Sequence, residues 1–206
     1  VFSISRSKTV DVNYQQITAD LSNTTEAVNA INTVFASVEN KSITSITLLN
    51  NAGSLGEMNT VGNLDSEKIQ QTIQLNTTTP LVLSNEFIKF TKQLNCKKQI
   101  INISSGAAMN PYAGWSIYCT SKAALDMTTK TIATEQNELK NGVKCVAIYP
   151  GVVDTNMQTT IRKTSESEFK NVQRFIELKE NNELYTPDFV ADKIFQIDIS
   201  NTLENG

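Results

Sequence analysis

The chain has 206 residues, of which 39% are hydrophobic and 19% charged, and its net charge at pH 7 is −3. These totals suit one globular α/β domain, residues 1–206, with a sizeable core. The lack of a basic run argues against a nucleic-acid partner, and no apolar run approaches the roughly 20 residues that span a bilayer.

The sequence contains no histidine. This removes Ser-His-Asp hydrolysis, Cys-His proteolysis and histidine-ligated metal sites from the possible functions, and no metal site is expected. Cys96, Cys119 and Cys145 show neither a CxxC pair nor metal-ligand spacing, which indicates reduced thiols and a cytoplasmic protein. Acid–base chemistry therefore has to use Tyr, Lys, Asp, Glu or Cys.

Short apolar runs alternate with longer helical patterns, which predicts βαβ units and a parallel sheet. Strands are expected at 1–5, 14–19, 43–50, 99–104 and 143–149. Helices are expected at 22–38, 65–93, 114–141 and 159–180, and from 186 onward. Ser22 or Thr24 is the expected cap of the first helix, and Pro80 should make the second helix bent or locally irregular.

The stretch 152–183 is more charged and less apolar than the sequence on either side. It is either a mobile segment over a binding site or a solvated pair of surface helices. Both interpretations stay open from the residues alone.

Ser105 and the segment from Tyr118 to Lys122 carry most of the chemical information. Ser105 closes an apolar strand 13 residues before Tyr118, and Lys122 follows the tyrosine by four. Positions i and i+4 share one helix face, so the ammonium is expected near the phenol. A nearby cation lowers the pKa of a tyrosine from about 10, which makes Tyr118 a usable acid or base for a carbonyl and alcohol pair. A lone Tyr-x-x-x-Lys pair is common on helix surfaces, but the strand, the serine and the spacing together favour catalysis.

The motifs, taken in order, resemble the short-chain dehydrogenase/reductase family over nearly the whole chain. The shared markers are Asn51-Ala52-Gly53, Asn76, Ser105, Tyr118 with Lys122, and Pro150-Gly151. The segment NISSGAAMNPYAGWSIYCTSKAALDM, residues 102–127, is similar to that of sepiapterin reductases and of reductases of benzil and related diketones. The resemblance implies a Rossmann-like, doubly wound parallel sheet with helices on both faces.

The resemblance also implies the roles of the catalytic residues. Tyr118 would donate a proton to a substrate carbonyl oxygen as hydride reaches its carbon. Lys122 would lower the pKa of Tyr118 and bond the nicotinamide ribose, while Ser105 would orient the carbonyl. Asn76 would hold a water that links Lys122 to solvent. Further candidates for contact with the small carbonyl substrate are Trp115 and Gly151.

The cofactor contacts implied by the family lie where strands end. The residues expected beside the adenosine half are Asp20, Leu21, Asn51, Ala52 and Gly53, and those expected beside the nicotinamide are Pro150, Gly151 and Thr155. Taken singly, these are also ordinary turn residues.

Arg6 and Ser7 follow the strand expected at 1–5, which takes the place of the family's second strand. In dinucleotide folds an acidic residue there binds the ribose hydroxyls of NAD, whereas an arginine accommodates the 2′-phosphate of NADP. No Asp or Glu occupies positions 5–7. The cofactor is therefore expected to be NADP(H).

The family's glycine-rich phosphate loop has no counterpart in this sequence. The chain is therefore expected to be an incomplete domain that lacks its first strand and helix, with a final strand missing after Gly206. The leading expectation is an NADPH-dependent carbonyl reductase that forms a homodimer. The alternatives are an alcohol or steroid dehydrogenase working oxidatively, and a non-catalytic nucleotide-binding Rossmann module.

Overall fold

The computed structural model describes residues 1–10, 12–200 and 203–206. Parallel strands alternate with helices, as the hydrophobic pattern predicts. In chain order the elements are β1 (Phe2–Ser5), β2 (Gln15–Thr18), α1 (Thr24–Val38), β3 (Ser45–Asn50), α2 (Ser66–Ile73), η1 (Gln74–Thr78), α3 (Thr79–Thr91), β4 (Lys97–Ile103), η2 (Gly106–Ala108), α4 (Ser116–Asn137), β5 (Lys144–Ile148), α5 (Asn156–Lys163), α6 (Val172–Glu180) and α7 (Pro187–Ser200).

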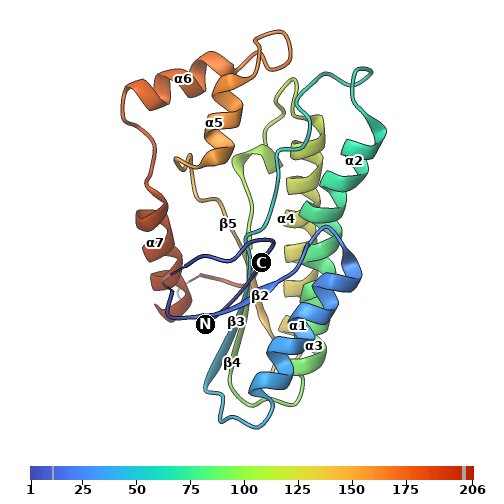
Figure 1. Ribbon diagram of the computed structural model, residues 1–206. Coiled ribbons are helices and arrows are strands. Elements are labelled where there is room, and N and C mark those ends of the chain that lie inside the picture. The colour runs from blue at the N-terminus through green and yellow to red at the C-terminus, as the bar shows by residue number, and fades with distance from the viewer. Residues whose placement is uncertain (11, 201–202) are drawn as a thin grey trace.

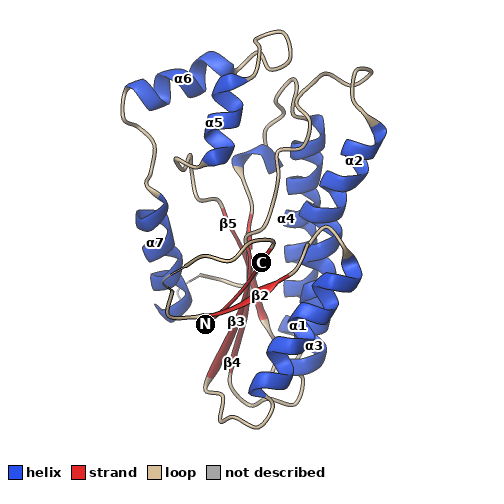
Figure 2. Ribbon diagram, in the orientation of Figure 1, coloured by secondary structure: helices blue, strands red, loops and turns tan. Residues whose placement is uncertain are grey.

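All strand pairs in the described chain are parallel. They form a two-stranded sheet of β1 and β2 and a three-stranded sheet in the order β3-β4-β5. Helices α1, α3 and α4 lie on one side of the strands and α7 on the other (Figures 1 and 2). The predicted Rossmann-like parallel architecture with helices on both faces is confirmed. Because the strands are parallel, their carboxyl ends lie at one edge, where residues from distant parts of the sequence meet.

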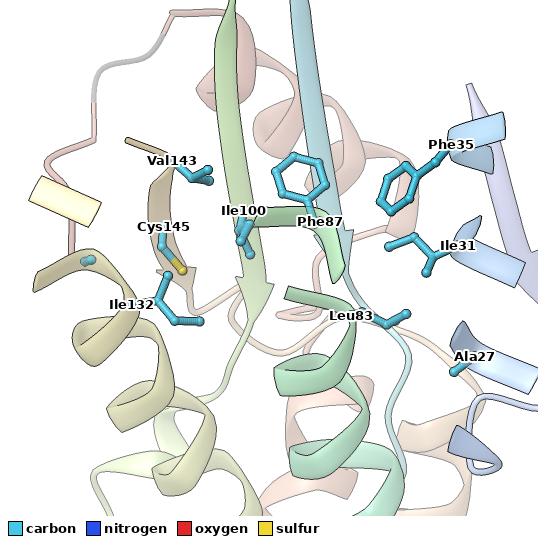
Figure 3. Close-up of a cluster of buried hydrophobic side chains, with 10 residues drawn as sticks. Ala27, Ile31, Phe35, Leu83, Phe87, Ile100, Ile132, Val143 and Cys145 are labelled. Atoms are coloured by element: carbon cyan, nitrogen blue, oxygen red, sulfur yellow. The ribbon is translucent and has the colours of Figure 1, made fainter. Parts of the chain in front are cut away.

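β4 is the central strand of the larger sheet, and its successive side chains serve opposite faces. Ile100 packs with Phe87 and Ile132 in the cluster drawn in Figure 3, which joins α1, α3 and α4 to the strands. Ile101, on the opposite face, packs with Val146 and the partly buried Ile194 of α7. Burying such an aliphatic side chain contributes about 1.5–3 kcal/mol, so this strand is held from both sides.

The helix expected at 65–93 is irregular where Pro80 predicts it. It divides into α2, the π turn η1 and α3, and the Thr79 amide bonds the Gln74 carbonyl five residues earlier. Pro80 has no N–H to donate to the carbonyl of Asn76, so the regular hydrogen-bond pattern cannot continue there. The wide turn contains Asn76, which is only 1% exposed.

Two local predictions are wrong. The cap of α1 is Asn23, whose side chain accepts hydrogen bonds from the Thr25 and Glu26 amides, and not Ser22 or Thr24. Asparagine is an equally favoured cap, and composition does not separate such neighbours.

The second wrong prediction is the single helical stretch at 159–180. The structure has two helices there, α5 and α6, with residues 164–171 between them. Ile161 of α5, Phe169 of the connecting segment and Phe175 of α6 are buried in one cluster with Trp115 and Tyr118. This helix pair is therefore packed on the domain through a buried apolar face. None of the helices in the described ranges is long and apolar enough to cross a membrane.

Gly114 permits this packing. Its φ is +92°, and a Cβ at this position would lie 2.2 Å from the Glu168 carbonyl oxygen. Next to it, the Trp115 ring stacks on Phe169 with centroids 4.4 Å apart. The start of α4 and the segment before α6 therefore approach more closely than any residue with a Cβ allows.

Gly114→Ala is expected to lower the free energy of unfolding by about 2–4 kcal/mol, because it combines left-handed backbone strain with a backbone collision. Chemical denaturation measures the effect. The matched control is Gly106→Ala, whose added methyl meets no atom within 4 Å. Equal stability of the two variants would contradict this account of Gly114.

Candidate active site

The carboxyl edge of the three-stranded sheet brings Ser105, Tyr118 and Lys122 together. Ser105 follows β4 and caps η2 by accepting a hydrogen bond from the Ala107 amide at 3.2 Å. Tyr118 and Lys122 lie one turn apart on the buried side of α4. The Lys122 Nζ atom is 5.8 Å from the centre of the Tyr118 ring, so the predicted shared helix face is confirmed.

Lys122 is a buried cation, only 5% exposed. Its Nζ donates a hydrogen bond to the carbonyl of Ile103, the last residue of β4, at 2.7 Å. Burial lowers the pKa of Lys122 to about 8, and the negative charge of Asp126 opposes this change. Lys122 therefore loses its charge at a lower pH than an exposed lysine does.

Tyr118 is 7% exposed, and its pKa is raised above the usual value mainly by burial. A hydrogen-bonding interaction with the Ser105 side chain opposes this, and the Cys119 thiol adds to it. The expectation of a lowered Tyr118 pKa is wrong for the protein by itself, because burial outweighs every favourable contact. The result is a neutral phenol beside a serine hydroxyl, which suits a proton donor.

Asn76 joins the site to the loop after β3. Its Oδ1 accepts from the Ser54 amide at 2.9 Å, and its Nδ2 donates to the Ser54 carbonyl at 2.7 Å and to Ser121 Oγ at 3.0 Å. This buried amide thus fixes the loop that begins with the exposed Asn51 and Ala52. At Gly53, a Cβ would lie 3.3 Å from Asn76 Oδ1 and 3.7 Å from Lys122 Nζ.

The candidate phosphate residues gather at the edge of the two-stranded sheet. Arg6 and Ser7 are exposed after β1, and the Ala19 amide, after β2, donates to the Ser5 carbonyl at 3.1 Å. Hydrogen bonds from the Ser22 amide and hydroxyl lower the pKa of Asp20, with a smaller contribution from the Arg6 charge. Arg6 and Asp20 are therefore electrostatic neighbours, as adjacent strand ends require.

Leu21 occupies a different environment from the other cofactor candidates. Its side chain packs against the main core cluster, and its carbonyl accepts a hydrogen bond from Thr79 Oγ1 at 2.6 Å. Leu21 therefore helps to hold the segment after β2 against the core and against the start of α3.

Pro150, Gly151 and Thr155 follow β5 on the way to α5. Gly151 has a φ of +75°, and a Cβ there would lie 2.8 Å from the Tyr185 ring. Thr155 precedes α5, is exposed, and makes no capping hydrogen bond with its side chain. Its hydroxyl therefore has no task within the helix cap.

Trp115 lies behind Tyr118. It is 5% exposed, and its ring meets the Tyr118 ring nearly edge-on at 5.5 Å between centroids. Among the described residues its Nε1 has no hydrogen-bond partner. In this arrangement Trp115 connects Tyr118 to α6, and little of its ring is left exposed to contact a substrate.

Sequence reasoning missed a buried group beside the lysine. Asp126, four residues after Lys122, accepts hydrogen bonds from the hydroxyls of Ser104 and Tyr149. The i, i+4 spacing of Lys122 and Asp126 was available in the sequence. The two hydroxyl partners come from the ends of β4 and β5, which only the fold brings together.

The residues present suit a nicotinamide dinucleotide. The Gly53 backbone lies against the Lys122 ammonium without an intervening side chain, the Thr155 hydroxyl makes no hydrogen bond that caps α5, and Arg6 offers an exposed guanidinium after β1. Close backbone approach, a cation and free donors are what a ribose and phosphate ligand requires.

Lys122→Met is expected to make stability respond differently to pH. The pKa of this lysine is about 8 in the folded protein and 10.5 in its ordinary state. Between these values the unfolded chain binds more protons, so wild-type stability gains with rising pH. The cost of the buried charge is complete below pH 8 and disappears towards pH 10.5.

The free energy of unfolding of Lys122→Met, relative to wild type, should therefore fall by about 3 kcal/mol between pH 7 and 10.5, at about 1.4 kcal/mol for each pH unit between the two pKa values. Denaturant titrations at a series of pH values measure it. The exposed Lys140→Met is the control and should give a flat difference. A flat difference for Lys122→Met as well would contradict the lowered pKa.

Comparison with known proteins gives the family. A family model described as short chain dehydrogenase matches residues 4–166. The benzil reductase ((S)-benzoin forming) of Bacillus subtilis is 40% identical over 209 aligned positions, which cover all of this chain and 85% of that protein. The sepiapterin reductase of Meriones unguiculatus is 34% identical over 163 positions, which cover 77% of this chain and 60% of that protein.

Solved structures agree. The crystal structure of the KRED1-Pglu enzyme superposes with a TM-score of 0.82 at 25% identity, covering 96% of this chain and 82% of the other. A short-chain dehydrogenase/reductase from Saccharomyces cerevisiae gives a TM-score of 0.75 at 26% identity, covering 90% and 74%. The fold, the matched family model and the full-length similarity agree: this chain belongs to the short-chain dehydrogenase family of oxidoreductases.

Proposed function

We propose that the protein is an NADPH-dependent carbonyl reductase that acts on a small ketone, a diketone or the side-chain carbonyl of a pterin. The observation that carries the proposal is the buried juxtaposition of Ser105, Tyr118 and Lys122 at the carboxyl edge of the parallel sheet. The substrate class is supported by relatives described as benzil reductase and sepiapterin reductase.

The proposed reaction uses the two neighbouring hydroxyls as a clamp for one oxygen. Ser105 and Tyr118 both donate hydrogen bonds to the substrate carbonyl oxygen, which polarises the carbonyl. The nicotinamide supplies the hydride when bound. As negative charge develops on the oxygen, Tyr118 transfers its proton, and the nearby Lys122 ammonium stabilises the phenolate that remains.

Proton return to Tyr118 is proposed to pass through Lys122 and a water held at Asn76. The side-chain hydrogen bonds of Asn76 are committed to Ser54 and Ser121. Pro80, four residues later, cannot donate to the Asn76 backbone carbonyl. This carbonyl is the proposed water ligand.

The remaining features of the proposal are coarser. Residues 1–206 are proposed to belong to one NADP-binding reductase domain, cytoplasmic because Cys96, Cys119 and Cys145 are free thiols. A homodimer is proposed, supported by the exposed Leu81 of α3 and Leu139 after α4.

Tyr118→Phe is expected to reduce carbonyl turnover by about 10²- to 10⁴-fold, because it removes the proton donor while keeping the ring contacts with Trp115. The measurement is NADPH oxidation with benzil and with sepiapterin, beside fluorescence titration of NADPH. Binding should remain close to wild type. Retained turnover in the variant would refute the assigned role, and turnover only with an alcohol and NAD⁺ would favour an oxidative dehydrogenase.

Arg6→Ala is expected to weaken NADPH binding by about 10- to 100-fold and to leave NADH binding unchanged. The reason is the loss of a charge-assisted contact to the 2′-phosphate, worth about 1.5–3 kcal/mol. Fluorescence titration with both cofactors measures this. Lys8→Ala, also exposed, is the matched control for a lost positive charge. Equal weakening of NADPH and NADH in Arg6→Ala would contradict a 2′-phosphate contact.

A further inference from the structure

Asp126 is a buried carboxylate with both oxygens occupied. It lies on α4 one turn after Lys122 and is 8% exposed. Ser104 donates its hydroxyl hydrogen to Oδ1, and Tyr149 donates its phenolic hydrogen to Oδ2. The two donated hydrogen bonds fix the orientation of the carboxylate.

The two donors are set by the backbone of the sheet. Ser104 directly follows β4, Tyr149 directly follows β5, and the Ser104 amide donates to the carbonyl of Ile148 at 2.8 Å. Ser105, the substrate serine of the proposed reaction, is the neighbour of Ser104, and Pro150 is the neighbour of Tyr149. The carboxylate is thus tied to the same strand ends that present the active site.

The negative charge reaches Lys122 through space. In the described part of the chain no ion pair joins Lys122 to Asp126, and the ammonium instead donates to the Ile103 carbonyl. Asp126 nevertheless raises the pKa of Lys122 against the effect of burial. In a water-poor interior such a charge acts over a greater distance than it does in bulk water.

The titratable groups that face Asp126 are Lys122 and Lys130 of α4 and Tyr149 after β5. The pKa of Tyr149 is raised to about 12 by burial and by its bond to Asp126, so it remains a neutral donor at working pH. A cavity of about 240 Å³ borders Asp126, Tyr149 and Lys130. The carboxylate therefore lies between this cavity and Lys122, held by its two hydroxyl donors.

We propose that Asp126 is a positioning residue of the reductase, whose fixed charge keeps the buried Lys122 ammonium cationic while leaving its hydrogens free for the Ile103 carbonyl and the cofactor ribose. Ser104 and Tyr149 hold this charge in place. The expected change in the pH dependence of turnover rests on the proposed function. The effect of Asp126 on the charge of Lys122 does not depend on any substrate.

The first test is the pH dependence of kcat/KM for benzil with NADPH in Asp126→Asn. Lys122 loses its charge at lower pH in this variant, so the alkaline decline in rate moves down, and the loss of rate at pH 8 exceeds the loss at pH 6 by about threefold or more. The amide still offers partners to Ser104 and Tyr149. Glu138→Gln removes an exposed charge next to the same helix and should leave the profile in place.

The second test needs no turnover. Denaturant titrations over a pH series compare Lys122→Met with wild type, and the double variant Lys122→Met/Asp126→Asn with Asp126→Asn. For each pair they give the pH at which the difference in free energy of unfolding begins to fall. A lower pH in the Asp126→Asn background confirms the action of Asp126 on Lys122, and an identical pH overturns the proposal. Absence of turnover in wild type with every carbonyl tried would count against the proposed function alone, and the stability test would then decide the role of Asp126.

Discussion

The site depends on keeping one ammonium group, that of Lys122, buried and charged at the end of the parallel sheet. Removing a cation from water is costly, and burial lowers the pKa of Lys122 to about 8 even with the Asp126 charge nearby. Two features of the fold oppose this cost. The Ile103 carbonyl accepts one of its hydrogens, and the Asp126 carboxylate supplies a negative charge one helical turn away.

Neither feature exists without the architecture around it. The Ile103 carbonyl is available because β4 ends there, and Asp126 is held because Ser104 and Tyr149 follow adjacent parallel strands. α4 fixes the spacing of the three groups on one face, with Tyr118, Lys122 and Asp126 at successive turns. The electrostatics of the site are therefore a consequence of strand order and helix register, and a small displacement of α4 would change all three groups together.

The parts of the site that could be predicted from the sequence are those that depend only on the spacing of neighbouring residues. The i, i+4 relation of Tyr118 and Lys122 fixes a shared helix face in any α-helix, and the strand before Ser105 is readable from its apolar run. The irregularity at Pro80 follows from its missing N–H. These inferences needed no knowledge of packing.

The parts that failed depend on contacts between distant segments. An aspartate on a helix is usually exposed, so Asp126 becomes notable only when Ser104 and Tyr149 are seen to reach it. The break between α5 and α6 is imposed by the burial of Phe169 against Trp115, and the raised Tyr118 pKa follows from burial that no spacing rule describes.

Aromatic contacts connect the polar segment after β5 to Tyr118 through the ring of Trp115. Phe169 stacks on Trp115, Phe175 lies 5.4 Å from the same ring, and Trp115 meets Tyr118 edge-on. A displacement of α6 would have to move Trp115 or break its ring contacts, and either change would alter the burial that raises the Tyr118 pKa. Tyr118 is thus positioned by α4 on one side and by this aromatic cluster on the other, so the packing of α6 and the burial of the phenol depend on one indole ring.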